Sequence, residues 1–219
     1  MKINYPGSLH NHSEYSNLRL RDSINRVNEL IDYAIELGHE VIAITEHETI
    51  SNAIKIEKYY KEIKKNNPNF KVIFGNEIYL CRDGLDGQNF IKGEDKYYHF
   101  ILLAKNAVGW RALRELSSRA WLNSYWDRGM ERVVTLKSDL EEIINKYPNS
   151  LIATTACLGG ELSTAVANMV NAEAMFDMDT RQREYNHIVD FISWCKNLFG
   201  DDFYLECAPA ASKDQIVVN

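Results

Sequence analysis

Residues 40–80, EVIAITEHETISNAIKIEKYYKEIKKNNPNFKVIFGNEIYL, contain an apolar run, a lysine-rich amphipathic segment and a second apolar run. The run EVIAITEH at 40–47 is typical of a strand that is buried on both faces. Residues 50–67 predict a helix that ends before Pro68, and residues 71–80 predict the second strand. A strand, a helix and a strand in this order predict a parallel pair joined by a crossover helix.

The same alternation continues on both sides of this unit. Gly38 ends an apolar pattern of helical spacing, and Ser138 with Glu141 predicts a capping box at the start of another helix. Strands that alternate with helices predict a mainly parallel sheet, in either a barrel or a doubly wound fold. Polar residues near several strand ends favour a barrel with one shared site, because chemistry in such folds collects at the carboxyl ends of the strands. The other expected strands are 8–12, 97–105, 150–157 and 202–209, and the other expected helices are 22–38, 108–126, one from 138, and 180–200.

The composition is that of an ordinary globular protein, with 45% hydrophobic and 26% charged residues among 219. The net charge of −6 makes the chain a poor nonspecific DNA binder, so metal ions or a neighbouring domain must supply positive charge if its substrate is a nucleic acid. No apolar run approaches the ~18 residues that span a membrane, and the first residues lack the pattern of a signal peptide, which predicts a cytoplasmic protein. The four cysteines show no CxxC spacing, which disfavours a disulfide framework or a zinc ribbon: Cys81, Cys157, Cys195 and Cys207.

Seven residues combine metal-binding chemistry with positions near the ends of expected elements. His10 and His12 are one residue apart, so on a strand both imidazoles point to the same side. Glu77 lies in an apolar strand, where an unpaired carboxylate would be costly and a metal is the economical partner. The full candidate set is His10, His12, Asp22, His47, Glu77, His99 and Cys157.

Each of these residues also has a structural interpretation. Asp22 could be only the N-cap of the following helix, and His47 could be a turn residue or a helix cap. His99 could be a core histidine with its hydrogen bonds satisfied, and Cys157 could be a small buried hydrophobic residue. The metal interpretation gains from the coincidence of ligand types at several strand ends. His39 and His187 fall outside this pattern.

Six segments in order resemble motifs of the PHP (polymerase and histidinol phosphatase) domain: LHNHSEYS (9–16), AITEHETI (43–50), GNEIYL (75–80), YYHFILLAKN (97–106), IATTACLGGEL (152–162) and FYLECAP (203–209). The resemblance covers nearly the whole chain. Residues 99–118 and 203–219 are more similar to the version at the N-terminus of the bacterial DNA polymerase III alpha subunit than to histidinol phosphatases.

The resemblance implies an α/β fold, a distorted seven-stranded (βα) TIM-like barrel of PHP type, with residues 1–219 in a single domain. It also implies up to three divalent metals, with zinc, manganese and iron all compatible with the mixed ligands. Carried onto this sequence, His10 and His12 would bind one metal, Glu77 would bridge to a second that His99 and Cys157 complete, and Asp22 with His47 would bind a third.

The activity that the family implies is metal-dependent phosphoester hydrolysis. In the polymerase branch this is a 3′–5′ proofreading exonuclease that acts on a DNA 3′ end, with a metal-bound hydroxide and no side chain as the nucleophile. The expected partner is the rest of the polymerase alpha subunit, onto which Tyr125 and Trp126 could dock, and neither a membrane nor a dinucleotide cofactor is expected. Lys55, Lys58, Lys61, Lys64 and Lys65 are interpreted as a solvated helix face in preference to a DNA track.

Two departures from the family pattern qualify this reading. Glu46 stands where the family usually has aspartate, and we expect it to orient a ligand instead of binding metal. The family's last motif, D-x-H on the seventh strand, should follow residues 215–219, so the chain is expected to lack the last strand and two ligands. Two alternatives stay open: a non-catalytic scaffold that metals stabilise, and a small-molecule phosphatase of the histidinol phosphatase type.

Overall fold

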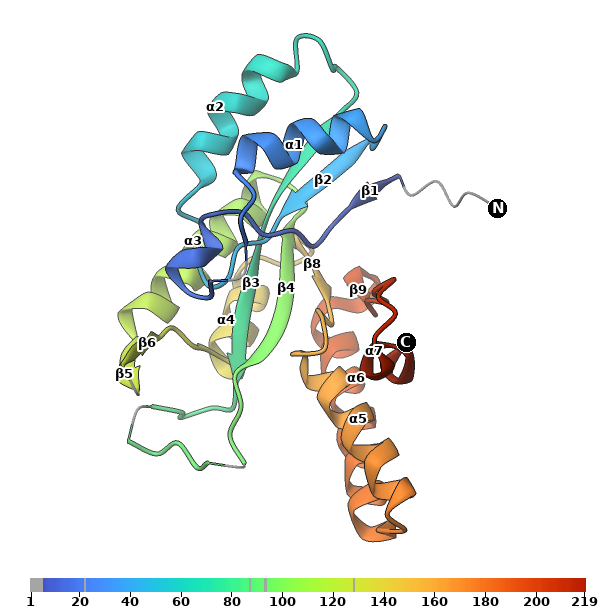
Figure 1. Ribbon diagram of the computed structural model, residues 1–219. Helices are drawn as coiled ribbons and strands as arrows, with labels where there is room; N and C mark the ends of the chain where they lie inside the picture. Colours follow the sequence, from blue (N-terminus) through green and yellow to red (C-terminus); the bar gives the residue numbers. More distant parts are fainter. Residues whose placement is uncertain (1–5, 22, 87, 93, 128) are drawn as a thin grey trace.

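A curled mixed sheet forms the centre of the computed structural model, which describes residues 6–21, 23–86, 88–92, 94–127 and 129–219 (Figure 1). The strands are β1 (Gly7–Ser8), β2 (Val41–Ile44), β3 (Lys71–Cys81), β4 (Tyr98–Ala104), β5 (Tyr125–Asp127), β6 (Met130–Arg132), β7 (Thr135–Leu136), β8 (Leu151–Thr154) and β9 (Phe203–Tyr204). The α-helices are α1 (Val27–Glu36), α2 (Ala53–Ile63), α3 (Ala107–Leu122), α4 (Lys137–Lys146), α5 (Glu161–Ala174), α6 (Met178–Phe199) and α7 (Lys213–Val218), and the 3₁₀ helices are η1 (Ser16–Leu18) and η2 (Gly200–Asp202).

The main sheet has the order β1-β2-β3-β4-β8-β9, and β7 pairs with the far end of β3. This α/β architecture confirms the predicted fold class, a distorted TIM-like barrel of PHP type. The sheet is mainly parallel, as predicted, with one strand as the exception. β4 is antiparallel to both β3 and β8, because the described residues between β3 and β4 form a loop and no helix, so the chain turns back directly. β1-β2, β2-β3 and β8-β9 are parallel as expected.

The largest part of the hydrophobic core lies between β3, β4 and β8 of the sheet and helices α3, α4 and α6. Phe100 on β4 is 1% exposed and contacts Phe191 and Phe199 of α6 edge-on and at a tilt. A second cluster packs α1 and α2 against β2, as Figure 1 shows at the other end of the sheet. The helices therefore cover the outer face of the sheet, and the inner face is left to smaller apolar clusters and to polar side chains.

Three local predictions made from the sequence differ from the structure. The strand that precedes His10 ends at Ser8, so His10 and His12 lie in the coil that follows it. The capping box at Ser138 does not form, because the Ser138 backbone N–H donates to the Asp83 carboxylate at 2.7 Å instead. The helix expected at 108–126 ends at Leu122, and the β5-β6 hairpin follows it. None of the described helices is both long enough and apolar enough to cross a bilayer.

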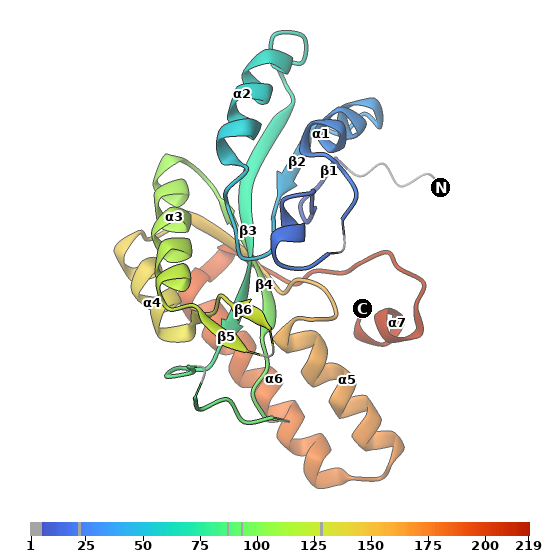
Figure 2. The ribbon, with the colours of Figure 1, turned by 60° about the vertical axis from the view of Figure 1, so that its left-hand side comes forward.

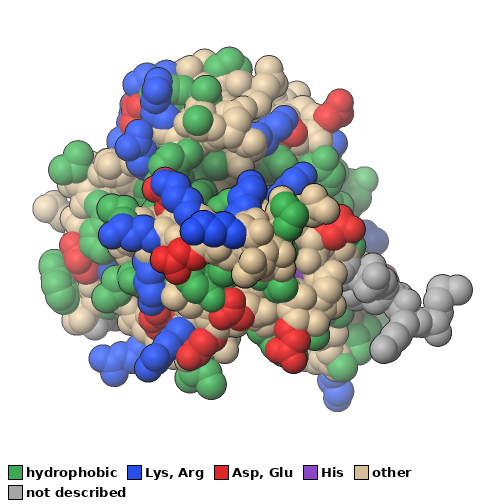
Figure 3. All heavy atoms as spheres, turned by 90° about the horizontal axis from the view of Figure 1, so that it is seen from above, with side chains coloured by type: hydrophobic (Ala, Val, Ile, Leu, Met, Phe, Trp, Pro, Cys, Tyr) green, Lys and Arg blue, Asp and Glu red, His purple; other side chains and the backbone are tan. Residues whose placement is uncertain are grey.

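The lysines of α2 and the turn after it lie at the end of the molecule that Figure 3 views, where Lys and Arg side chains gather. Lys55 pairs with Glu14 at 2.7 Å and Lys61 with Glu57 at 2.6 Å, and the Lys64 ammonium lies 5.0 Å from the ring centre of Tyr60. The contacts of Lys61 and Lys64 with residues four positions earlier are typical of a solvated helix face, the interpretation that the sequence favoured.

Helices α5 and α6 form a long antiparallel hairpin that projects from the sheet (Figure 2). At its base the Glu161 carboxylate accepts from Lys137 of α4 and from His187 of α6, both at 2.8 Å. Burial disfavours the charged form of Glu161, but these two donors outweigh it and lower the pKa of the carboxyl. The hydrogen bond that His187 donates to Glu161 likewise raises the pKa of His187 above its ordinary value. The ion pairs of Glu161 on α5 therefore link this helix to α4 and to α6.

Replacing His187 by glutamine is expected to change how stability depends on pH. Because the folded pKa of His187 is raised, its contribution is complete below its unfolded pKa of about 6.5 and is lost as pH rises through the folded value. The His187 side chain is 39% exposed, so we expect a difference of less than about 1 kcal/mol. Urea unfolding of both proteins with chelator at pH 6 and pH 9 measures it. Parallel pH profiles for the two proteins would refute the pairing.

Candidate metal centre

Glu77 lies at the centre of a cluster of four imidazoles on the inner face of the sheet. Its side chain is 0% exposed. Oε1 lies 2.9 Å from His99 Nδ1 and 3.6 Å from His10 Nε2. Oε2 lies 2.8 Å from His47 Nδ1 and 3.1 Å from His12 Nε2. Each carboxylate oxygen thus faces two rings, an arrangement that suits a carboxylate shared between two cations.

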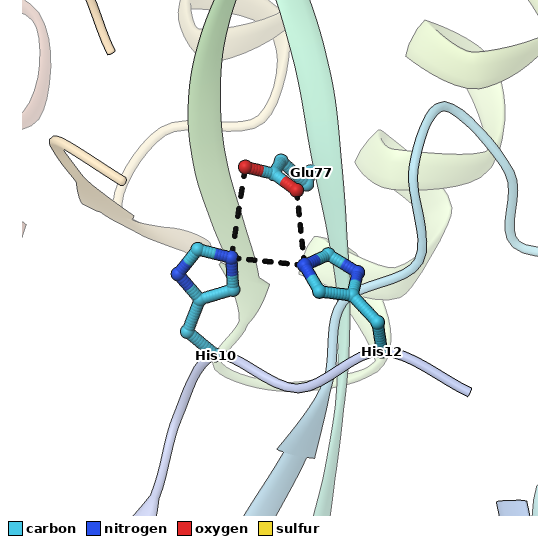
Figure 4. Close-up of side chains that lie close together, drawn as sticks. All are labelled: His10, His12 and Glu77. Carbon is cyan, nitrogen blue, oxygen red and sulfur yellow. Dashed lines mark hydrogen bonds and ion pairs between the residues drawn. The ribbon is translucent and has the colours of Figure 1, made fainter. Parts of the chain in front are cut away.

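Neighbouring strands bring these residues together. His47 follows β2 and forms a parallel bridge with Glu77 of β3, with the Glu77 N–H donating to Glu46 O at 3.0 Å and the Glu48 N–H to Glu77 O at 2.8 Å. His99 is the second residue of the antiparallel strand β4 and pairs with Tyr79 of β3. His10 and His12 extend from the coil after β1 and point towards Glu77 (Figure 4). Residues far apart in the sequence therefore meet because their strands are adjacent in the sheet.

The spacing of the nitrogens fits a bound metal ion. His10 Nε2 and His12 Nε2 lie 3.1 Å apart. Two nitrogen ligands at about 2.0–2.1 Å from a tetrahedral zinc ion lie roughly 3.3 Å from each other. Among the described residues, two groups have metal-binding atoms that all lie within 4.8 Å of one another. They are His10, His12 and Glu77, and His47, Glu77 and His99. The residues present therefore fit a pair of divalent cations that share Glu77.

Cys157 adds a sulfur donor to the second group. It lies in the turn after β8, where Ala156 has a positive φ of 57° and the Gly159 N–H donates to Sγ at 3.4 Å. Sγ lies 3.4 Å from His99 Nδ1 and 4.0 Å from Glu77 Oε1. Gly160 is needed in this turn, because a Cβ there would lie 2.2 Å from the backbone oxygen of Thr155. The turn thus aims the thiol at His99.

The pKa shifts in the cluster show that its anionic groups, Glu77 and Cys157, are stabilised by neighbouring positive charge. Burial opposes ionisation of Glu77, but the hydrogen bonds from four histidines outweigh it and hold the pKa of its carboxyl well below the ordinary range. Burial also opposes the charged forms of His10 and His99, but their anionic neighbours raise the pKa of each ring to about 10. Burial likewise opposes the Cys157 thiolate, but its hydrogen bond with His99 lowers the pKa of the thiol. In the metal-free chain, protons supply the positive charge that a metal would otherwise bring.

Comparison with known proteins settles the family of the chain. The family model described as "PHP domain" matches residues 8–210. The chain belongs to the PHP domain family. It is 40% identical over 216 residues to "Probable DNA polymerase YorL" of Bacillus subtilis (strain 168), and equally to "DNA-directed DNA polymerase" of Bacillus phage SPbeta. It is 35% identical over 215 residues to "DNA polymerase III subunit alpha" of Borreliella burgdorferi. Each match covers 96% of this chain and 16% of the relative, so the chain spans about a sixth of the length of these polymerases.

In this PHP domain the contacts of the Glu46 carboxylate lie in the coil that carries His12 and at Asn52. Its carboxylate accepts from the Ser13 N–H at 3.0 Å, from the Ser16 hydroxyl at 2.5 Å and from the Asn52 amide at 2.7 Å. The Ser16 hydroxyl lies 3.1 Å from His12 Nδ1. Glu46 thus anchors the coil that carries His12 and contacts the His12 imidazole indirectly, through the Ser16 hydroxyl.

Six of the seven predicted ligands meet in the cluster: His10, His12, His47, Glu77, His99 and Cys157. Asp22 lies outside the described residues. At the start of α1 the Val27 N–H donates to the Glu14 carboxylate at 2.7 Å. His47, which the family pattern assigns with Asp22 to a third metal, also contacts Glu77 directly.

Sequence reasoning missed three charged groups beside the cluster. Glu206 lies 2.6 Å from His10, just beyond β9. Its position after an apolar run at a strand end is the signal that identified the other candidates. Arg19 and Glu48 form a buried ion pair next to His47, with 2.8 Å between Nε and Oε2. Burial disfavours the charged form of Glu48 more than Arg19 favours it, so the pKa of the Glu48 carboxyl is raised to about 7.

Proposed function

We propose that this chain is the metal-dependent phosphoesterase domain of a replicative DNA polymerase, and that it removes nucleotides from a DNA 3′ end. The observation that carries the proposal is the shared carboxylate of Glu77, which joins two groups of metal-binding atoms on the inner face of the sheet. Similarity to polymerases over 96% of the chain supports the assignment to DNA. The remainder of the polymerase is then the partner of residues 1–219.

The residues of the cluster divide into bridging and terminal roles. Glu77 would bridge two cations, His10 and His12 would hold one of them, and His99 with Cys157 would hold the other. Cations held there supply Lewis-acid activation of water and neutralise phosphate charge. They also offset the net charge of −6 that would otherwise repel DNA. Imidazole, carboxylate and thiolate together are compatible with zinc, manganese or iron.

Metal analysis and a nuclease assay test the proposal on the 219-residue chain. We expect at least two metals per chain by elemental analysis of the protein purified without added metal. We also expect loss of nucleotides from a 5′-labelled primer, which stops with chelator and resumes when Zn²⁺ or Mn²⁺ is restored. Glu77→Gln is the negative control for contaminating nucleases. A metal-loaded chain that leaves the primer intact contradicts the exonuclease, and hydrolysis of only a small phosphomonoester would revive the small-molecule phosphatase.

A scaffold role has its own support in the structure. The ligands come from the coil after β1, from the turn after β2, from β3, from β4 and from the turn after β8. Cations bound between these segments would cross-link the sheet whether or not they catalyse a reaction. A ligand at 1,000 times its Kd stabilises the folded state by about 4 kcal/mol. Chelator should therefore lower the unfolding free energy, and a large loss of stability in a chain without nuclease activity would favour the scaffold.

A further inference from the structure

Glu206 is held in a single orientation at the edge of the metal centre. Its carboxylate is 21% exposed, and Oε1 lies 2.6 Å from His10 Nδ1. Oε2 accepts from the Thr154 hydroxyl at 2.8 Å. The backbone N–H of Glu206 donates to the Thr155 hydroxyl at 2.9 Å. Because β8 pairs with β9 just before these residues, the contacts that fix Glu206 come from the sheet itself.

The contact with Glu206 decides which nitrogen of His10 faces the metal centre. An ionised carboxylate only accepts hydrogen bonds, so His10 Nδ1 must carry the proton that lies between them. The other ring nitrogen, Nε2, points at His12 Nε2 and at Glu77, at 3.1 Å and 3.6 Å (Figure 4). In the neutral ring, this leaves the lone pair on Nε2, directed at the centre.

Glu206 is placed to act through His10 and not as a ligand. The nitrogen that it contacts is the one turned away from Glu77, and its second oxygen is taken by Thr154. His12 has a different partner, because its Nδ1 lies 3.1 Å from the neutral hydroxyl of Ser16. A carboxylate on the remote nitrogen of a metal-binding histidine fixes its tautomer and ring plane and makes the ring a stronger base.

We propose that Glu206 is the positioning residue of this metal centre, which holds His10 with Nε2 directed at the metal, and that Thr154 acts through Glu206. The inference rests on the proposed function, since it assigns His10 as a ligand. It adds a residue just beyond β9 to a site whose other members lie on β3 and β4 or in the segments that follow β1, β2 and β8.

Titration of the metal-free chain with Zn²⁺ tests the proposal in four variants. Glu206→Ala is expected to weaken the His10–His12 metal 10- to 100-fold, as removal of such partners typically does. Glu206→Gln should lose less than about 10-fold, because its amide oxygen still accepts from Nδ1. Thr154→Val should lose roughly 2- to 5-fold in the wild-type background and nothing beyond Glu206→Ala in the double variant. All variants should reach the wild-type stoichiometry at saturating Zn²⁺.

A control and an independent readout separate positioning from folding. Asp202→Asn removes a nearby carboxylate that pairs with Lys105 on the surface, and it should leave Zn²⁺ affinity unchanged. NMR of the metal-free chain should show a downfield proton on His10 Nδ1 that disappears in Glu206→Ala and persists in Asp202→Asn. This proton reports the contact between Glu206 and His10 even if the wild type binds no metal. The absence of metal would contradict the proposed function but not this contact.

Two results would overturn the proposal. Wild-type Zn²⁺ affinity in Glu206→Ala would show that the contact has no role in binding. Loss of one whole metal in both Glu206→Ala and Glu206→Gln would show that Glu206 is itself a ligand.

Discussion

Glu77→Gln is expected to abolish metal binding at both groups of the centre while the chain stays folded. The amide keeps the shape of the side chain but loses the charge, and its nitrogen cannot bind a cation. Both groups should fail together, because each contains Glu77. Loss of an outer partner alone costs 10- to 100-fold in metal affinity, so loss of the bridging carboxylate should exceed about 100-fold. Isothermal titration with Zn²⁺ or Mn²⁺ and elemental analysis measure the effect.

Glu161→Gln is the matched control for this variant. Glu161 is also buried, at 5% exposed, and also accepts from a histidine, but it lies at the base of the α5-α6 hairpin and contacts Lys137. We expect it to destabilise the chain and to leave metal stoichiometry at the wild-type value. Full metal retention in Glu77→Gln would contradict the shared centre, and loss of only one metal would show that the two groups bind independently.

Much of this centre could be predicted because ligand types follow rules that a sequence displays. A carboxylate in an apolar strand, such as Glu77, needs a partner, and histidines near strand ends are natural candidates. The exact course of the backbone could not be predicted in the same way. β4 runs against β3 because a loop connects them, and no periodicity within either strand records that direction. The family pattern placed His99 in the site even so, since it does not depend on strand direction.

The supporting contacts were harder to find than the ligands. Glu206 contacts His10 from 196 positions away in the sequence, and Thr154 contacts Glu206 from 52 positions away, so these partners are set by tertiary packing. Ser138 shows the converse error: a local rule predicted its cap, and the distant Asp83 carboxylate took its place. Local patterns thus identify which residues can bind metal, and the packing of the sheet decides which residues hold them in place.

Arg19→Met is expected to lower the unfolding free energy by less than the about 3–5 kcal/mol that breaking a fully ionised buried pair costs, because Glu48, whose pKa is about 7, takes up a proton when Arg19 is removed. Arg19 joins the coil that carries His12 to the turn after His47, with its Nε 2.8 Å from Glu48 Oε2 and a second hydrogen bond to the backbone of Glu131. Both side chains are nearly fully buried, at 6% and 2% exposed. Removing Arg19 alone leaves Glu48 in the interior without its cation. Urea unfolding in the presence of chelator measures the loss without a contribution from bound metal.

A double variant and a surface control separate the ion pair from simple loss of volume. Arg19→Met with Glu48→Gln leaves no buried charge, so it should recover most of the stability that Arg19→Met loses. Arg82→Met removes an arginine that pairs with Asp95 but is 43% exposed, and it should cost less than about 1 kcal/mol. If the double variant is no more stable than Arg19→Met, the loss comes instead from the contacts of Arg19 with Trp121 and with the Glu131 backbone. The ion pair would then not be what holds the two ligand-bearing segments together.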